Sequence, residues 1–234
     1  MTLSARLKHG DYIMTKILLI RHAQATGNIE GVFQGHLDSG ITDVGVKQLE
    51  ALSERMKTVE FDAIYSSPLI RARETAKAAN KYHQLPITFF DELMEINGGD
   101  WESIPFDKIP ELYPEQSAVW EDEPYNFEAP NGEAMRNVCK RMVDTIGKIA
   151  QENDGKTVCV VSHGCAIRNY ITFLRYGTLE KLAYVEWCDN TAIYTIEYEN
   201  GVAKIIGQAD NSHLDKKIST FHNQSWWKKI KTDD

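Results

Sequence analysis

An arginine and a histidine stand together at the end of an apolar run near the start of the chain. The segment KILLIRHAQATGN (residues 16–28) opens with ILLI, continues with Arg21 and His22, and then becomes polar. The apolar run predicts a buried strand, and in open α/β sheets ligands bind beyond the carboxyl ends of strands. Arginine presents a planar fork of donors suited to phosphate, and histidine can form covalent intermediates. The pair indicates phosphoryl chemistry on histidine, although alone it also fits a strand end with two polar residues.

Two further predicted strand ends carry groups suited to phosphate. His163 follows the apolar run in VCVVSHGCAIRNY, and Arg71 lies one turn into a helix in YSSPLIRARETA. Helix starts and arginines both favour anions. Taken singly, Arg71 and its neighbour Arg73 also fit a solvated helix face, and His163 also fits a buried, hydrogen-bonded histidine. Because parallel strands bring their carboxyl ends to one edge of a sheet, the three together predict a phosphate site.

Alternating strand and helix patterns predict the scaffold that positions these residues. Strands are expected at residues 16–21, 63–66, 87–90, 157–162, 192–198 and 202–207. Helices between them favour a largely parallel sheet that is covered on both faces. The turn Glu199-Asn200-Gly201 predicts a terminal hairpin and hence an antiparallel edge. We therefore expect a three-layer α/β/α sandwich with a mostly parallel sheet.

Four helices are expected from apolar spacing and end signals. The first is capped by Thr42, the second spans residues 70–82 after Pro68, the third follows Asn131-Gly132, and the fourth begins at Gly164. Their expected apolar faces are Val46, Leu49, Leu52 and Met56 in the first, Met135, Val138, Met142, Ile146 and Ile149 in the third, and Ile167, Ile171 and Leu174 in the fourth.

The chain is expected to hold one domain, at residues 14–214, with Met14 as its functional start. Residues 1–13 are then an N-terminal extension and residues 215–234 a C-terminal tail. Residues 97–131 are proline-rich, aromatic and weakly periodic. A long irregular insertion in a compact domain is often a lid or a binding loop.

Composition excludes several classes of function. The 234 residues carry a formal net charge of -8, which argues against nucleic-acid binding. The sequence has no apolar run of membrane-spanning length and no secretion signal. Its four cysteines lack CxxC spacing, so buried reduced thiols and a cytoplasmic location are expected. The tail pair Trp226-Trp227, beside three lysines, is expected to pack on its own domain or on a second subunit of a homodimer rather than on a membrane.

The order of motifs resembles that of the histidine phosphatase superfamily, the phosphoglycerate-mutase-like enzymes, over residues 16–214. RHAQATGN resembles the opening motif, with Ala23 where glycine is commoner, and YSSPLIRARETA matches the second arginine motif. GHLDSGITDVGVKQLEAL, LMEINGGDWES, APNGEA, VVSHG and DNSHL resemble the remaining blocks. The departures, such as Ile41 for leucine and Ser103 for glycine, leave the charged groups unchanged.

The resemblance implies a role for each matched residue. His22 would be the nucleophile, with its other ring N–H held by an acceptor such as a backbone carbonyl. Arg21, Arg71 and His163 would clamp the phosphate oxygens, so that no metal and no other cofactor is needed. Asn28, Gln34 and Gly164 are the expected substrate-binding positions.

Glu95 matches the general acid of the family. It would protonate the leaving oxygen and then deprotonate the water that attacks phosphohistidine, which requires a protonated carboxyl near neutral pH. The neighbouring acids Asp91, Glu92 and Glu102 compete for this role, and a surface carboxylate is the alternative reading for each.

Eight acids and one base, Lys108, lie between Trp101 and Pro130. If this segment covers the pocket, it should disfavour highly anionic substrates and tolerate neutral or cationic leaving groups. We favour the alternative, a solvated acidic loop. Five aromatic residues could either wall an apolar pocket or form the loop's own small core: Trp101, Tyr113, Trp120, Tyr125 and Phe127.

The expected function is a metal-independent phosphomonoesterase that hydrolyses a small phosphorylated metabolite. The first alternative is a phosphoglycerate mutase, which uses the same residues but returns the phosphate to its substrate. That branch typically carries a longer acid motif rich in arginine and asparagine, unlike LMEINGGDWES. The second alternative is a non-catalytic module that binds phosphorylated ligands, which ranks last because the nucleophile and the acid are both present.

Overall fold

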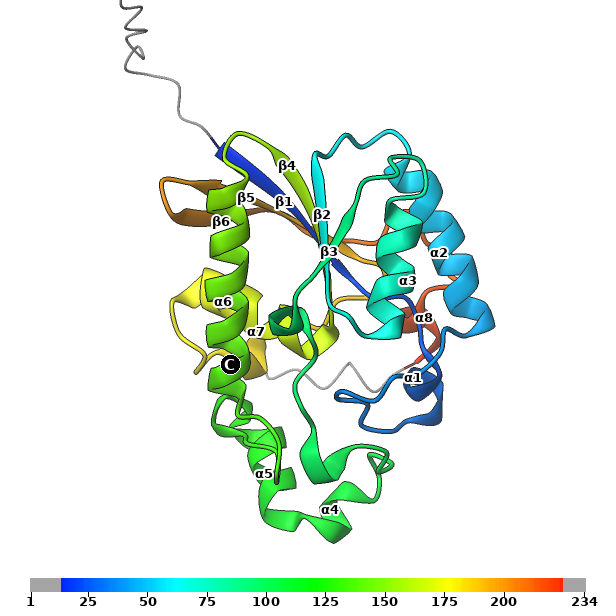
Figure 1. Cartoon of the computed structure of the whole chain (residues 1–234). Coiled ribbons are helices and arrows are strands. Elements are labelled where there is room, and N and C mark those ends of the chain that lie inside the picture. The colour runs from blue at the N-terminus through cyan, green and yellow to red at the C-terminus, as the bar shows by residue number, and fades with distance from the viewer. Residues whose placement is uncertain (1–13, 225–234) are drawn as a thin grey trace, which may run out of the picture.

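The structure is a computed structural model, and it describes residues 14–224. Its centre is a six-stranded sheet in the order β3-β2-β4-β1-β5-β6 (Figure 1). The strands are β1 (Met14–Arg21), β2 (Ala63–Ser66), β3 (Ile87–Phe89), β4 (Thr157–Ser162), β5 (Ile193–Glu199) and β6 (Val202–Asp210). The predicted strands are confirmed, with bounds that differ by at most three residues.

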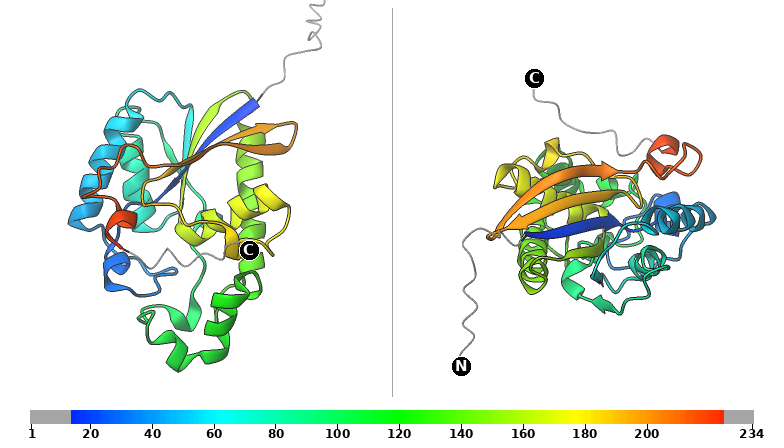
Figure 2. Two further views of the ribbon diagram at one scale, coloured as in Figure 1. Left: turned by 180° about the vertical axis from the view of Figure 1, so that it is seen from behind. Right: turned by 90° about the horizontal axis from the view of Figure 1, so that it is seen from above.

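Strands β1 to β4 are parallel, and β5 and β6 form an antiparallel hairpin at one edge (Figure 2). The hairpin turn is Asn200-Gly201, with φ angles of 51° and 79°. Positive φ at both turn residues matches the twist of the flanking strands, and asparagine and glycine accept that conformation most readily. The expected parallel sheet with an antiparallel edge is confirmed.

Short and long helices connect these strands. The α-helices are α1 (Thr26–Glu30), α2 (Asp43–Met56), α3 (Ile70–Ala79), α4 (Ile109–Leu112), α5 (Pro114–Asp122), α6 (Met135–Glu152), α7 (Gly164–Tyr176) and α8 (Thr220–Asn223). Single 3₁₀ turns are η1 (Asp91–Leu93), η2 (Gly99–Trp101), η3 (Pro124–Asn126) and η4 (Leu182–Tyr184).

Helices cover both faces of the sheet, which gives the expected three layers. Alternate side chains of β1 point to opposite faces. Ile17 and Leu19 pack with α6 and α7, whereas Leu18 and Ile20 pack with α2 and α3 (Figure 1). The predicted apolar face of α6 is entirely buried.

The expected apolar face of α2 is wrong at Val46, which is 46% exposed. The helix buries Gly45 and Gln48 instead, along with Leu52. A side chain at Gly45 would lie 2.2 Å from the Gln24 carbonyl oxygen, so this glycine allows close approach to the loop after β1. Gln48 is buried because its amide oxygen accepts a hydrogen bond from the Gln24 N–H at 2.8 Å. These polar contacts set the rotation of the helix.

Residues 97–131 form a chain of short helices, η2, α4, α5 and η3, at one end of the molecule (Figure 1). Trp101, Ile109 and Phe127 are buried and belong to the same apolar cluster as α6. The segment is therefore packed onto the domain rather than irregular.

The start of the expected tail also packs on the domain. Thr220 is 1% exposed, and its hydroxyl accepts a hydrogen bond from Gln48. The Trp226-Trp227 pair and residues 1–13 lie outside the described residues. Within residues 14–224, no helix is both long and apolar enough to cross a membrane. All four cysteines are buried and unbridged, as expected.

Candidate active site

The predicted strand ends meet at one edge of the sheet. Arg21 at the end of β1 pairs in register with Ser162 at the end of β4, so His22 and His163 both follow directly at that edge. Their ring centroids lie 5.1 Å apart. Arg71 is the second residue of α3, which follows β2, the other neighbour of β4. The parallel sheet thus brings together residues that are up to 142 positions apart in the chain.

His22 is buried and held in one orientation. Its Nδ1 lies 2.7 Å from the carbonyl oxygen of Ala23. Because a carbonyl can only accept, Nδ1 carries the proton and Nε2 keeps a free lone pair in the neutral ring. Burial, with a contribution from Arg71 and Arg21, holds the pKa of His22 well below its ordinary value. The ring is therefore neutral at neutral pH, with Nε2 unprotonated and the Nδ1–H on a backbone carbonyl as predicted.

Arg21 precedes His22 in the chain and has N–H groups that the described part of the protein does not use. One terminal nitrogen donates to the Cys188 carbonyl oxygen, whereas Nε is buried and has no partner within the described part of the chain. A Cβ atom at Gly164 would lie only 3.2 Å from that Nε. The absence of a side chain at Gly164 therefore makes room for the guanidinium.

Arg71 is 1% exposed and is fixed by three hydrogen bonds. Its terminal nitrogens donate to the carbonyl oxygens of Leu37 at 2.6 Å and Gly35 at 2.7 Å, and Nε donates to Nδ1 of His163 at 3.2 Å. Burial lowers the pKa of Arg71 to about 10, so it stays a cation at neutral pH. Each terminal nitrogen keeps one N–H for a ligand.

His163 does not face the cavity, although the resemblance implies that it contacts phosphate. Both ring nitrogens are engaged, Nδ1 with Arg71 and Nε2 with the Ser67 hydroxyl at 2.7 Å. The residue is fully buried and does not line the cavity described below. Burial, with Arg71 next to it, holds the pKa of His163 well below its ordinary value. In this structure a neutral His163 therefore orients Arg71, and its direct contact with phosphate stays a prediction.

Glu95 caps the N-terminus of α7, close to the two histidines. Its Oε2 accepts a hydrogen bond from the Cys165 N–H at 3.0 Å. Its Oε1 accepts from the N–H groups of Ala166 at 2.9 Å and Ile96 at 3.0 Å. Since Oε2 has a single donor, it keeps a lone pair that can hold a proton. The carboxyl is thus fixed by backbone groups at the edge of the sheet.

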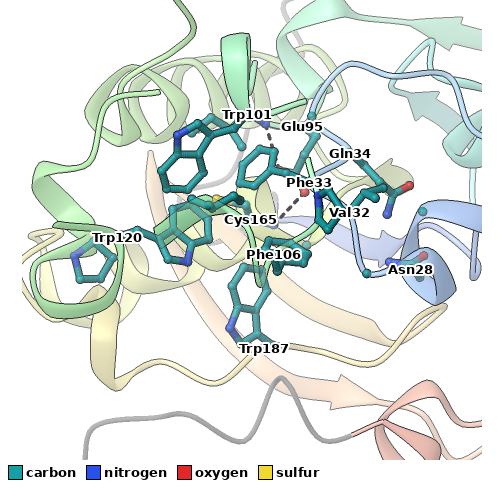
Figure 3. A pocket seen from close by; sticks show the side chains of 18 of the residues that line it. Asn28, Val32, Phe33, Gln34, Glu95, Trp101, Phe106, Trp120, Cys165 and Trp187 are labelled. Atoms are coloured by element: carbon teal, nitrogen blue, oxygen red, sulfur yellow. Dashed lines mark hydrogen bonds between the residues drawn. The ribbon is translucent and has the colours of Figure 1, made fainter. Parts of the chain in front are cut away.

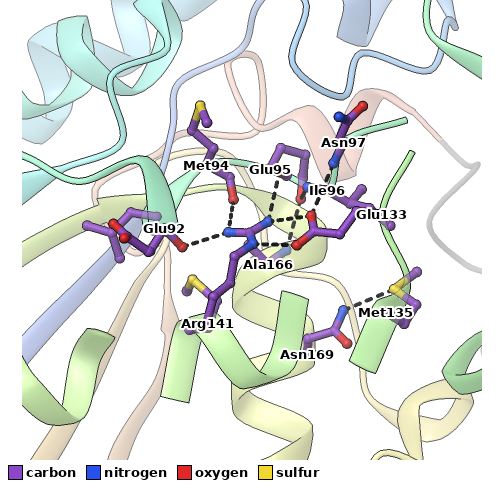
Figure 4. Close-up of polar contacts among 12 residues, drawn as sticks. Glu92, Met94, Glu95, Ile96, Asn97, Glu133, Met135, Arg141, Ala166 and Asn169 are labelled. Atoms are coloured by element: carbon purple, nitrogen blue, oxygen red, sulfur yellow. Dashed lines mark hydrogen bonds and ion pairs between the residues drawn. The ribbon is translucent and has the colours of Figure 1, made fainter. Parts of the chain in front are cut away.

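Arg141 of α6 holds the segment that carries Glu95 (Figure 4). It donates to the carbonyl oxygens of Glu92, Met94 and Glu95 at 2.6, 2.7 and 3.0 Å. Its other two donors form a bidentate ion pair with Glu133, at 2.7 and 3.0 Å. All five N–H groups of Arg141 are therefore used on this segment and its partner.

A cavity of about 850 Å³ opens in front of these groups, and Arg21, His22, Arg71 and Glu95 line it. The expected substrate-binding residues Asn28, Gln34 and Gly164 line it as well.

Of the four acids considered for the proton-transfer role, Glu95 alone lines the cavity. Asp91 and Glu92 are exposed. Glu102 instead accepts hydrogen bonds from the N–H groups of His36 and Gly98. The cavity therefore favours Glu95 over its neighbours.

Both interpretations of the acidic, aromatic segment are confirmed in part. Asp107, Glu121 and Asp122 line the cavity, and all eight acids except Glu102 are exposed, so the segment borders the cavity and is also a solvated acidic loop. Trp101 and Trp120 line the cavity, and the other three aromatic residues pack behind them.

Several cavity residues were not predicted. They are Val32, Phe33, Phe106 and Trp187 (Figure 3), and also Arg168. They come from loops and from a helix with a strong apolar pattern, where the sequence offers no spacing signal. Within residues 14–224, no three His, Cys, Asp or Glu side chains are grouped so that they could hold a metal ion.

Comparisons with known proteins agree with this architecture. Phosphoserine phosphatase 1 of Hydrogenobacter thermophilus is 32% identical over 186 residues, which cover 80% of this chain and 88% of that protein. The adenosylcobalamin/alpha-ribazole phosphatase of Escherichia coli is 29% identical over 148 residues, 63% of this chain and 73% of that protein. The solved structure of Bacillus stearothermophilus YhfR has a TM-score of 0.81 at 29% identity, covering 85% of this chain and 98% of that one.

These relatives support a phosphatase and do not favour the mutase alternative. The model of the histidine phosphatase superfamily (branch 1) matches residues 17–211, which is most of the chain. The chain therefore belongs to the histidine phosphatase superfamily.

Proposed function

We propose that the protein is a metal-independent phosphomonoesterase that forms a phosphohistidine on His22. The observation that carries the proposal is the state of the His22 ring. Its Nδ1–H is bound to the Ala23 carbonyl oxygen, burial keeps the ring neutral, and it lines the cavity together with two buried arginines. An unprotonated Nε2 beside fixed positive charge suits attack on a phosphate monoester.

In the first step, Nε2 of His22 attacks phosphorus and the P–O bond to the alcohol breaks. Glu95 gives its proton to the leaving oxygen, so the alcohol departs neutral. Arg21 and Arg71 bind the non-bridging oxygens, where negative charge gathers in the transition state. The N–H on Nδ1 stays on the Ala23 carbonyl oxygen throughout.

In the second step, water attacks phosphorus and the P–N bond breaks. Glu95, now a carboxylate, takes the proton from water, so inorganic phosphate leaves and both groups return to their starting states. The role of His163 in this scheme is to hold Arg71 through its Nδ1.

The substrate in this proposal is a small phosphorylated metabolite. Relatives are named as phosphatases of phosphoserine and of alpha-ribazole phosphate, and both are candidates. Neither the cytoplasmic location nor a homodimer is tested by the structure, and both stay predictions.

A phosphate-release screen over phosphorylated metabolites, run in excess chelator, tests the proposal. We expect release that is insensitive to the chelator and abolished in His22→Ala. His83→Ala is the matched control, because His83 does not line the cavity and hydrogen-bonds the Met56 carbonyl oxygen instead. Normal release by His22→Ala would overturn the mechanism, and loss of activity in chelator would show that a metal is needed.

A further inference from the structure

The cavity extends well beyond the groups that would bind phosphate, and its outer wall is aromatic. Phe106, Trp120 and Trp187 line this part (Figure 3). Phe106 is 47% exposed although it lies in a concave site. Apolar surface of this kind in a cavity favours a ligand that covers it.

This wall is supported by a second layer of rings. Phe33 packs against Phe106 with ring centroids 5.9 Å apart, and edge-on against Trp120 at 5.5 Å. Trp120 in turn packs edge-on against the buried Phe127 at 4.8 Å. Because the rings hold one another, a ligand would meet a pre-formed apolar surface and little ordering would oppose binding.

The charges around the outer cavity are mainly negative. Glu30, Asp107, Glu121 and Asp122 line it. Apart from the two phosphate-facing arginines, Arg168 is the one Lys or Arg of residues 14–224 in its wall.

Arg168 uses two of its five N–H groups within the protein. Its Nε donates to the Val185 carbonyl oxygen and a terminal nitrogen to that of Leu182, both at 2.7 Å, and its guanidinium stacks on Trp187 at 4.7 Å. Among residues 14–224, four carboxylates thus line this part of the cavity against one cation, so a second anionic group on a substrate is disfavoured.

The size of the cavity also favours a bulky ligand. Its volume of about 850 Å³ is near the upper end of the roughly 300–1,000 Å³ that is typical of pockets for drug-sized ligands. A phosphorylated amino acid would leave most of the aromatic wall uncovered, and its carboxylate would meet the acidic side chains.

We propose that this enzyme selects phosphate monoesters whose alcohol part is a bulky aromatic group without a second negative charge, and that Phe106 and Trp120 are specificity-determining residues. The inference rests on the proposed phosphatase function and adds its substrate class.

The test compares esters of primary alcohols, so that the chemical leaving ability stays similar while size and charge change. We would measure kcat/KM of the full chain for ethyl, benzyl and 2-naphthylmethyl phosphate. A second pair, 4-carboxybenzyl and 4-(aminomethyl)benzyl phosphate, isolates charge. Burial of an aromatic ring should raise kcat/KM about 10- to 100-fold from ethyl to naphthylmethyl phosphate, and the amine should be preferred over the carboxylate.

Phe106→Ala should lower the naphthylmethyl-to-ethyl ratio about tenfold, because it removes the most exposed ring of the wall. Leu112→Ala is the matched control, since Leu112 lies in the same segment, is 57% exposed and does not line the cavity. It should leave the ratio unchanged. Trp120→Ala provides a second variant of the wall.

The outcomes separate the two proposals. If all esters are hydrolysed with His22-dependent, nearly equal kcat/KM, the substrate class is overturned while the phosphatase function stands. A preference for the carboxylate over the amine would overturn the charge argument. If no ester is hydrolysed in a His22-dependent manner, the proposed function itself fails, and the substrate class with it.

Discussion

Replacement of Arg141 by methionine should let the Glu95 carboxyl move relative to Arg21 and Arg71. Arg141 lies on α6, outside the cavity lining, and contacts the Glu95 segment through backbone carbonyl groups. Methionine keeps the helix propensity and much of the side-chain length but removes all five donors. The change therefore leaves the cavity chemistry intact and frees the segment that carries the carboxyl.

The burial of the Arg141 contacts sets how much stability and kcat this substitution should cost. Two of the three carbonyl contacts are partly buried, and the side chains of Arg141 and Glu133 are each 17% exposed. Removing one partner of a buried ion pair costs about 3–5 kcal/mol, and partial exposure reduces this. We expect the free energy of unfolding to fall by about 2–4 kcal/mol. A shift of the Glu95 carboxyl by about 1 Å should lower kcat about 100-fold.

The assay combines denaturant unfolding with kcat and with the Kd for inorganic phosphate. Because Arg21 and Arg71 are untouched, the Kd should change far less than kcat. Lys140→Met is the matched control, since Lys140 is adjacent on the helix, its side chain is 76% exposed, and it pairs with Asp144 at the surface. Such a pair contributes no more than about 1 kcal/mol, and kcat should not change.

Glu133→Gln provides a milder variant in case Arg141→Met fails to fold. It removes the ion pair but leaves the three carbonyl bonds of Arg141 in place, so kcat should fall less than in Arg141→Met. A stable Arg141→Met protein with kcat within twofold of the wild type would refute the reasoning.

Three further predictions follow from the site. Glu95→Gln should lower kcat about 10²- to 10⁴-fold, with phosphate still bound, which product-inhibition constants would reveal. Gly164→Ala places a Cβ 3.2 Å from Nε of Arg21 and should weaken phosphate binding severalfold in titration calorimetry, whereas Gly147→Ala, whose nearest contact would be 3.7 Å away, should not. Burial holds the pKa of both His22 and His163 low, so the unfolded chain takes up protons below about pH 6.5 that the folded protein does not. The free energy of unfolding should thus fall with decreasing pH, by up to about 1.4 kcal/mol per pH unit for each histidine, and more gently in His22→Asn; an unchanged slope would contradict the burial argument.

The strands, and the meeting of Arg21, His22, Arg71 and His163 at one edge of the sheet, could be predicted from the sequence. Central strands of a parallel sheet are buried on both faces, so β1 and β4 read as unbroken apolar runs. The parallel register of Arg21 with Ser162 then places His22 and His163 at the same edge. The second arginine motif follows β2, the neighbour of β4, and this topology brings Arg71 to the site.

The groups that orient the site could not be predicted, because their partners are backbone atoms of distant loops. Arg141 stands between Lys140 and Met142 in an amphipathic helix and reads as a solvated residue. Its five bonds depend on where residues 92–95 lie, which no periodic pattern shows. The error at Val46 has a similar cause, since the polar contact of Gln48 with the loop after β1 sets the rotation of α2.

The central claim is a covalent phosphate on His22, and rapid quenching of a single turnover tests it most directly. With a substrate labelled on phosphorus, the wild type should show a transient, acid-labile label that tandem mass spectrometry maps to His22. Glu95→Gln should form and lose this label more slowly, and His22→Ala should show none. Full turnover without a label on His22, or a label on another residue, would contradict the account.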